Sequence, residues 1–135
     1  MRDTLINGSG FHHSASVVRT MSMSETQALL ISMAIEGPVA FALVALARWP
    51  SRGALHVGIA SMVSTAVTHP QMWALAIWSF GRFPYWPAIL SIEALVVVVE
   101  AALIAWMAQL TPARAGIVSL VANSASFLFG LLLTA

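Results

Sequence analysis

The sequence predicts an all-α membrane protein, an up-down-up-down bundle of four transmembrane helices joined by short loops. The chain of 135 residues is 59% hydrophobic and only 8% charged, whereas soluble domains average about 25% charged residues. A soluble fold of this size could not bury so much apolar surface. The apolar residues fall into four stretches, each long enough for the roughly 20 helical residues that cross a hydrocarbon core.

The first 25 residues are predicted to form a polar extension (1–25), ahead of a transmembrane domain over residues 26–135. The extension has no apolar run of the kind that a signal peptide needs. Its adjacent His12 and His13 have no further ligands near them in the sequence, so they do not predict a metal site.

The first two predicted spans are separated by a loop rich in charge, Pro and Gly. The first span covers residues 27–47, and the segment Arg48–Gly53 ends it. The second covers residues 54–80 and is longer than a bilayer requires, so we expect it to tilt, to kink at Pro70 or to extend beyond the hydrocarbon.

The third and fourth predicted spans cover residues 88–108 and 115–134, after turns at 81–87 and 109–114. The run Val96–Val99 would suggest a strand in water, but a lipid-facing helix tolerates it. Because all three connections are short, successive helices are expected to be antiparallel neighbours.

The arginines predict the orientation, because Arg and Lys near span ends are retained on the cytoplasmic side. The first and third loops hold Arg48, Arg52 and Arg114, whereas the second holds only Arg82. Both termini are therefore expected on the non-cytoplasmic side. The richness in Ala, Leu and Val, with Arg as the only strong base, is typical of a multi-pass protein of a bacterial inner membrane.

Aromatic residues gather at the ends of the predicted spans, as Trp and Tyr do at membrane interfaces. One group is expected at the interface near the second loop: Trp78, Phe80, Phe83, Tyr85 and Trp86. Trp49 and Trp106 are expected at the opposite interface.

Charge and motifs exclude several function classes. Six Arg and five acids leave a net charge of +1, so there is no basic field to attract nucleic acid. Without cysteine there are no disulfides, thiolate metal sites or Cys nucleophile. No phosphate-binding glycine loop, GxSxG elbow or HExxH motif is present. The sequence therefore predicts no catalytic residue and no metal ligand, and it identifies no cofactor.

The informative residues are polar side chains inside the predicted spans: Glu36, His69, Glu93, Glu100 and Asn123. An acid at a helix centre costs about 2.5 to 3.5 kcal/mol on insertion scales. We therefore expect these side chains to face one another or a wet cavity, and we hypothesise that they form an ion or proton relay.

Counting along each helix from the side of the first and third loops places these residues in two layers. Glu100 and Asn123 lie about 14 Å in, and Glu36 about 18 Å, so these three are expected to share protons and hydrogen bonds. His69 and Glu93 lie about 24 Å in and are expected to form an imidazolium–carboxylate contact.

Small and polar residues also line single faces of two spans. Ser119, Asn123, Ser126 and Gly130 follow steps of four, three and four on the last span and predict a helix-packing seam. A comparable line on the second span consists of Gly58, Ser61, Thr65 and Thr68. Packing contacts between membrane helices are enough by themselves to explain such seams.

Three functions are compatible with these features. The first is an accessory or structural subunit of a membrane assembly, with the lipid bilayer and a homo-oligomer or larger complex as partners. The second is a proton- or cation-coupled transporter or channel that uses the intramembrane Glu and His residues. The third is an intramembrane enzyme or metal site. Acids that line an open interior cavity would favour transport, and acids closed off in a packed bundle would favour a structural role.

Overall fold

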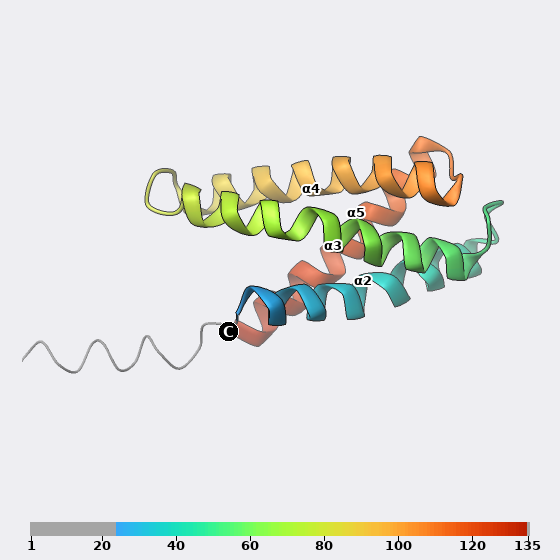
Figure 1. Ribbon diagram of the computed structural model, residues 1–135, viewed down its shortest axis with the longest axis horizontal. Helices are drawn as coiled ribbons and strands as arrows, with labels where there is room; N and C mark the ends of the chain where they lie inside the picture. Colours follow the sequence, from blue (N-terminus) through green and yellow to red (C-terminus); the bar gives the residue numbers. More distant parts are fainter. Residues whose placement is uncertain (1–23, 135) are drawn as a thin grey trace, which may run out of the picture.

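A computed structural model describes residues 24–134, which form a bundle of four helices (Figure 1). Helix α2 spans Glu25–Ala47, α3 spans Ala54–Ser79, α4 spans Tyr85–Ala108 and α5 spans Pro112–Thr134. The prediction of an all-helical bundle is confirmed for this range. Of the polar extension predicted over residues 1–25, only Ser24 and Glu25 lie inside the described residues.

The helices pack in a closed ring. Each helix packs against its neighbours in the chain, and α5 also packs against α2. In Figure 1, α5 runs obliquely away from α4 until its end lies beside the start of α2.

Three helices are long and apolar enough to cross a membrane: α2, α4 and residues Pro112–Leu133 of α5. Helix α3, which covers all but the last residue of the predicted span 54–80, does not reach the hydropathy of the other three helices. Its hydropathy is lowered mainly by His56, His69, Pro70 and Gln71, and less by the buried Ser and Thr residues of its polar face, which are Ser61, Ser64, Thr65 and Thr68.

Two helices begin three residues earlier than predicted, because proline fits the first turn of a helix. Pro112 is the first residue of α5, and Pro87 is the third residue of α4, which begins at Tyr85. The backbone nitrogens of a first turn need no hydrogen-bond partner within the helix, so proline loses nothing there. Helices α2 and α3 run on through Pro38 and Pro70.

Helix α2 begins at a capping box. The Ser24 hydroxyl accepts a hydrogen bond from the backbone nitrogen of Gln27 at 3.2 Å, and the Gln27 side chain accepts one from the Ser24 nitrogen at 3.0 Å. These two bonds satisfy nitrogens that the first helical turn leaves without partners.

The α2–α3 and α4–α5 loops meet at one end of the bundle. The Arg52 backbone nitrogen donates to the Ala108 carbonyl at 3.3 Å, and its guanidinium donates to the Met107 carbonyl at 3.3 Å. We term this the arginine end, because these two loops and the start of α5 carry Arg48, Arg52 and Arg114.

The half of the bundle at the arginine end is a packed apolar core. It is made of small and branched side chains from all four helices and the last loop, which are Ala40, Val44, Val57, Ala60, Ile104, Ala108, Leu110, Ala115 and Val118. The polar side chains described below therefore lie beyond this core, toward the α3–α4 loop.

The outer surface is apolar, as a lipid-facing surface would be. On α3, Leu55, Ile59, Val63 and Val67 recur every four residues and are all at least 43% exposed. Exposed aromatic side chains surround the α3–α4 loop, and they are Trp78, Phe80, Phe83, Tyr85 and Trp86.

Helices α2 and α3 cross at a pair of glycines. A Cβ on Gly58 would lie 3.0 Å from the Gly37 carbonyl oxygen, and a Cβ on Gly37 would lie 2.6 Å from Met62 Cγ. The absence of side chains at both positions lets the two backbones approach closely. This crossing lies next to Glu36 and fixes its height against α3.

Candidate functional site

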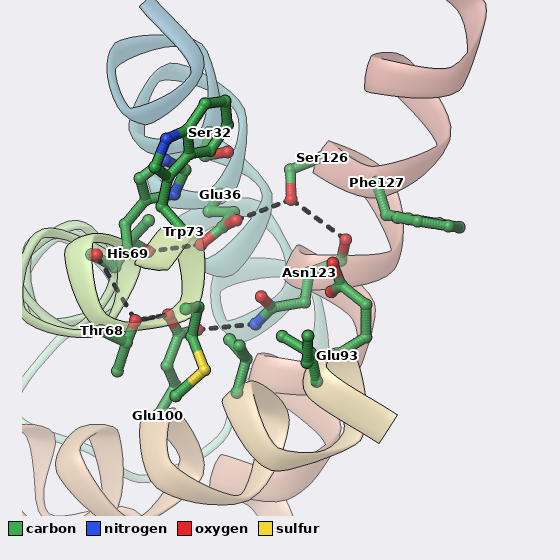
Figure 2. Close-up of a pocket in the computed structure, with 14 residues that line it drawn as sticks. Ser32, Glu36, Thr68, His69, Trp73, Glu93, Glu100, Asn123, Ser126 and Phe127 are labelled. Carbon is green, nitrogen blue, oxygen red and sulfur yellow. Dashed lines mark hydrogen bonds between the residues drawn. The ribbon is translucent and has the colours of Figure 1, made fainter. Parts of the chain in front are cut away.

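A cavity of about 210 Å³ lies between the four helices, in the half of the bundle away from the arginine end (Figure 2). All four helices line it. The polar lining residues are Ser32, Glu36, Thr65, Thr68, His69, Glu93, Glu100, Asn123 and Ser126. The apolar ones are Met72, Trp73, Ile92, Val96 and Phe127.

Glu36 links α2 to two other helices. Its side chain is only 2% exposed. One carboxyl oxygen accepts a hydrogen bond from the Thr65 hydroxyl of α3, and the other accepts one from the Ser126 hydroxyl of α5 at 2.6 Å (Figure 2). The acid therefore has a polar partner for each oxygen.

Glu100 forms the matching link from α4 and is 1% exposed. Its Oε1 accepts a hydrogen bond from the Thr68 hydroxyl at 2.7 Å, and its Oε2 accepts one from Asn123 Nδ2 at 2.6 Å. Asn123 Nδ2 also donates to the Ser119 carbonyl at 2.9 Å. Thus the structure brings Glu36, Glu100 and Asn123 to one cavity, where hydroxyl side chains connect them to neighbouring helices.

The hydroxyls that bond these acids each face a second acceptor one helical turn away. The Thr68 oxygen lies 3.1 Å from the Ser64 carbonyl, and the Ser126 oxygen lies 3.0 Å from the Asn123 carbonyl. Thr65 has the same choice, since its oxygen lies 3.0 Å from the Ser61 carbonyl.

Because a hydroxyl has one hydrogen and rotates freely, this arrangement serves both charge states of an acid. When Glu100 is a carboxylate, Thr68 donates its hydrogen to Oε1. When Glu100 carries a proton, the acid donates to the Thr68 oxygen, and the Thr68 hydrogen turns to the Ser64 carbonyl. The heavy atoms need not move between the two states.

Neither buried acid has a cationic partner among the described residues. Within residues 24–134 no ion pair involves Glu36 or Glu100; Arg52 and Arg114 lie at the arginine end, and Arg82 bonds the Trp78 carbonyl near the α3–α4 loop. Burial of an unpaired carboxylate is costly. The hydroxyl and amide donors are therefore the groups that offset the charge when either acid is ionised.

Glu93 is half-buried and lies on the same face of α4 as Glu100, two turns away. It makes no hydrogen bond within residues 24–134. It is therefore the pocket acid that is most open to solvent or to an incoming ligand.

The expected contact between His69 and Glu93 does not form, although both residues line the cavity. The His69 ring stacks on Trp73, with centroids 5.9 Å apart, and it lies against the backbone of Glu25 at the start of α2. His69 Nε2 is buried and has no hydrogen-bond partner in the described part of the chain. The stacking and the approach to α2 hold the imidazole away from the acid.

Of the residues predicted to form a packing seam on α5, Ser119, Asn123 and Ser126 each donate a hydrogen bond to another helix. The Ser119 hydroxyl donates to the Val97 carbonyl of α4 at 3.0 Å, so it joins the two helices directly. For Gly130, a Cβ would meet no heavy atom within 4 Å among the described residues. The last turns of α5 lie away from α4 (Figure 1).

Sequence reasoning treated Thr65, Thr68 and Ser126 as packing residues and did not place them in the relay. The depth of each residue along its helix could have predicted the contacts of Thr65 and Ser126 with Glu36. Glu36, Thr65 and Ser126 each lie twelve residues from the borders Arg48, Gly53 and Arg114, a depth of about 18 Å. Equal depth predicts that the three side chains can meet.

No group of three or more His, Asp or Glu side chains in the described residues has the arrangement of a metal site.

Comparison with family models, with curated protein sequences and with solved structures finds no match to this chain.

Proposed function

We propose that the chain crosses a membrane four times, up and down in succession, and that its central cavity takes up and releases protons or a small cation during transport. Three helices are apolar enough to cross. For α3 the support is its orientation. The polar face is covered by the other helices, and the exposed stripe from Leu55 to Val67 is apolar.

Site-directed labelling tests the four spans, because the chain has no cysteine. We expect a membrane-impermeant maleimide to label Ser51→Cys and Thr111→Cys from one side of sealed vesicles and Phe83→Cys from the other. The arginine end is expected on the cytoplasmic side. If Phe83→Cys reacts from the same side as Ser51→Cys, α3 does not cross and the topology is wrong.

One observation carries the transport proposal: the hydrogen-bond network around Glu36 and Glu100 accommodates an acid with or without its proton. A purely structural polar contact needs only one of these states. A proton carrier must be stable in both, and intramembrane acids that face a cavity are typical of such pathways.

The residues have separate roles in this proposal. Glu93 is half-buried and makes no hydrogen bond within residues 24–134, so it exchanges protons or cations with the cavity. Glu36 and Glu100 hold the charge deeper in the bundle. Thr65, Thr68, Ser126 and Asn123 supply the donors that stabilise the ionised forms.

Flux measurements in proteoliposomes test the proposal. We expect wild-type protein to conduct protons or an alkali cation and the double variant Glu93→Gln, Glu100→Gln to lose this flux, with Glu100→Gln alone inserting normally. Glu25→Gln is the matched control, since Glu25 is an exposed acid outside the cavity lining. Equal flux from the double variant and wild type would remove these acids from the pathway. Absence of flux from folded wild-type protein would refute transport itself.

A role as an accessory subunit is the second candidate, and it is favoured by Glu93, which has no hydrogen-bond partner within residues 24–134. A cationic side chain on a helix of another chain would pair with this half-buried carboxylate. Under this alternative, Glu93→Gln weakens recovery of a stable partner in gentle co-purification, whereas no flux is seen with any variant.

A further inference from the structure

A groove on the outer surface at the arginine end is separate from the acid cavity. Its volume is about 430 Å³. Helix α3 and the loop before it supply one wall, with Arg52, His56, Ile59 and Val63. The end of α4 and the residue after it supply the other, with Trp106 and Gln109. Trp106 is 78% exposed. The groove is therefore basic near Arg52 and His56 and apolar near Ile59 and Val63.

Positive charge at this end is not neutralised within the described chain. The acids of residues 24–134 are Glu25, Glu36, Glu93 and Glu100. The last three line the cavity in the opposite half of the bundle, and Glu25 begins α2 beside His69. Arg48, Arg52 and Arg114 thus have no acidic partner in this range.

Arg52 is the arginine placed to bind a ligand in the groove. Arg114 lies over the Trp49 ring, 5.7 Å from its centroid. One terminal nitrogen of Arg52 donates to the Met107 carbonyl at 3.3 Å, which orients the guanidinium at the head of the groove. A guanidinium has five N–H donors, so most of them remain for a phosphate. His56 lies one turn further along the same wall.

We propose that this groove binds an anionic phospholipid, with the phosphate on Arg52 and His56 and an acyl chain along Ile59 and Val63. The dimensions agree with this. The helical part of this wall, from Ala54 to Val63, is ten residues long, which is about 15 Å, or half of a hydrocarbon core about 30 Å thick. Trp106 lies near the end of a helix that is apolar enough to cross a membrane, and tryptophans near the ends of such helices commonly meet lipid headgroups. The inference requires that the chain is embedded in a membrane, but it does not depend on transport.

Native mass spectrometry of the protein in detergent tests this, with phosphatidylglycerol and phosphatidylcholine of identical acyl chains as probes. We expect wild-type protein to retain phosphatidylglycerol preferentially. Loss of one basic side chain near the lipid surface is expected to weaken that preference about fivefold, so Arg52→Gln should reduce it and Arg52→Lys should largely keep it.

Arg48→Gln is the matched control. Arg48 lies in the same loop but does not line the groove, and its left-handed backbone, with φ of 51°, is one that a glutamine already adopts at position 109. We expect this variant to keep the wild-type preference. Equal losses in Arg48→Gln and Arg52→Gln would mean that only net charge attracts the lipid, which overturns the groove site.

Two further results bear on the proposal. His56 forms no hydrogen bond within the described residues, so we expect His56→Gln to leave the fold unchanged. Because the variant removes a proposed phosphate contact, it should lower the preference for phosphatidylglycerol, and it tests the site even if Arg52→Gln disturbs folding. Competition by glycerol phosphate as strong as that by the intact lipid would show that the apolar wall contributes nothing, and would refute a lipid site.

Discussion

Replacement of Gly58 by alanine tests whether the α2–α3 crossing is as close as the structure places it. The new Cβ would lie 3.0 Å from the Gly37 carbonyl oxygen and 3.2 Å from Phe41 Cβ. Both neighbours are backbone or the first side-chain atom, so neither can turn away, and the helices must separate.

The expected change in stability of Gly58→Ala follows from two opposing effects. Overpacking of a fitted contact costs about 1 to 3 kcal/mol, whereas alanine in place of glycine stabilises a helix interior by about 0.5 to 1 kcal/mol. Gly116 in α5 is the matched control, since a Cβ there would meet no heavy atom within 4 Å. We expect Gly116→Ala to be neutral or stabilising and Gly58→Ala to be less stable than it by about 1 to 3 kcal/mol.

Reversible unfolding in mixed micelles, followed by helical circular dichroism, measures this difference. If Gly58→Ala is as stable as Gly116→Ala, the two backbones do not approach closely and the position assigned to Glu36 beside α3 is also in error.

Two further changes test the hydrogen bonds. Thr68→Val keeps the shape of the side chain but leaves Glu100 Oε1 without its donor, so we expect a loss of about 1 to 3 kcal/mol in unfolding free energy, most of which Thr68→Ser should recover; equal stability of the Val and Ser variants would contradict the Thr68–Glu100 bond. Ser24→Ala removes the α2 capping box and should cost about 1 kcal/mol, whereas Thr26→Ala, an exposed change next to it, should have little effect; the same loss from both would exclude the cap as the cause.

The positions of the helices were largely predictable, because apolar runs and the charged, Pro and Gly residues between them determine local structure. Charge, Pro and Gly in Arg48–Gly53 separate two apolar runs, and the helices end and restart there as expected. The errors at the starts of α4 and α5 have one cause. Proline was taken as part of the preceding loop, although Pro87 and Pro112 lie in first turns where its missing N–H costs nothing.

The candidate site was predictable in its acids but not in its pairings. A carboxyl in an apolar helix is costly wherever it points, so Glu36 and Glu100 stand out from the sequence alone. Which group bonds them depends on helix rotation and tilt. Equal depth suggested His69 as the partner of Glu93, but the ring turns to Trp73 and to the start of α2 instead.

The sequence by itself predicted that this chain is helical, that much of its surface is apolar and that a few acids lie inside the predicted spans, because these properties follow from residue type and local spacing. The tertiary structure decided that α5 closes against α2, that Thr65, Thr68 and Ser126 supply donors to the acids, and that a cavity remains beside a packed core. These features depend on how four helices cross, and side-chain contacts between helices distant in the chain fix the crossings.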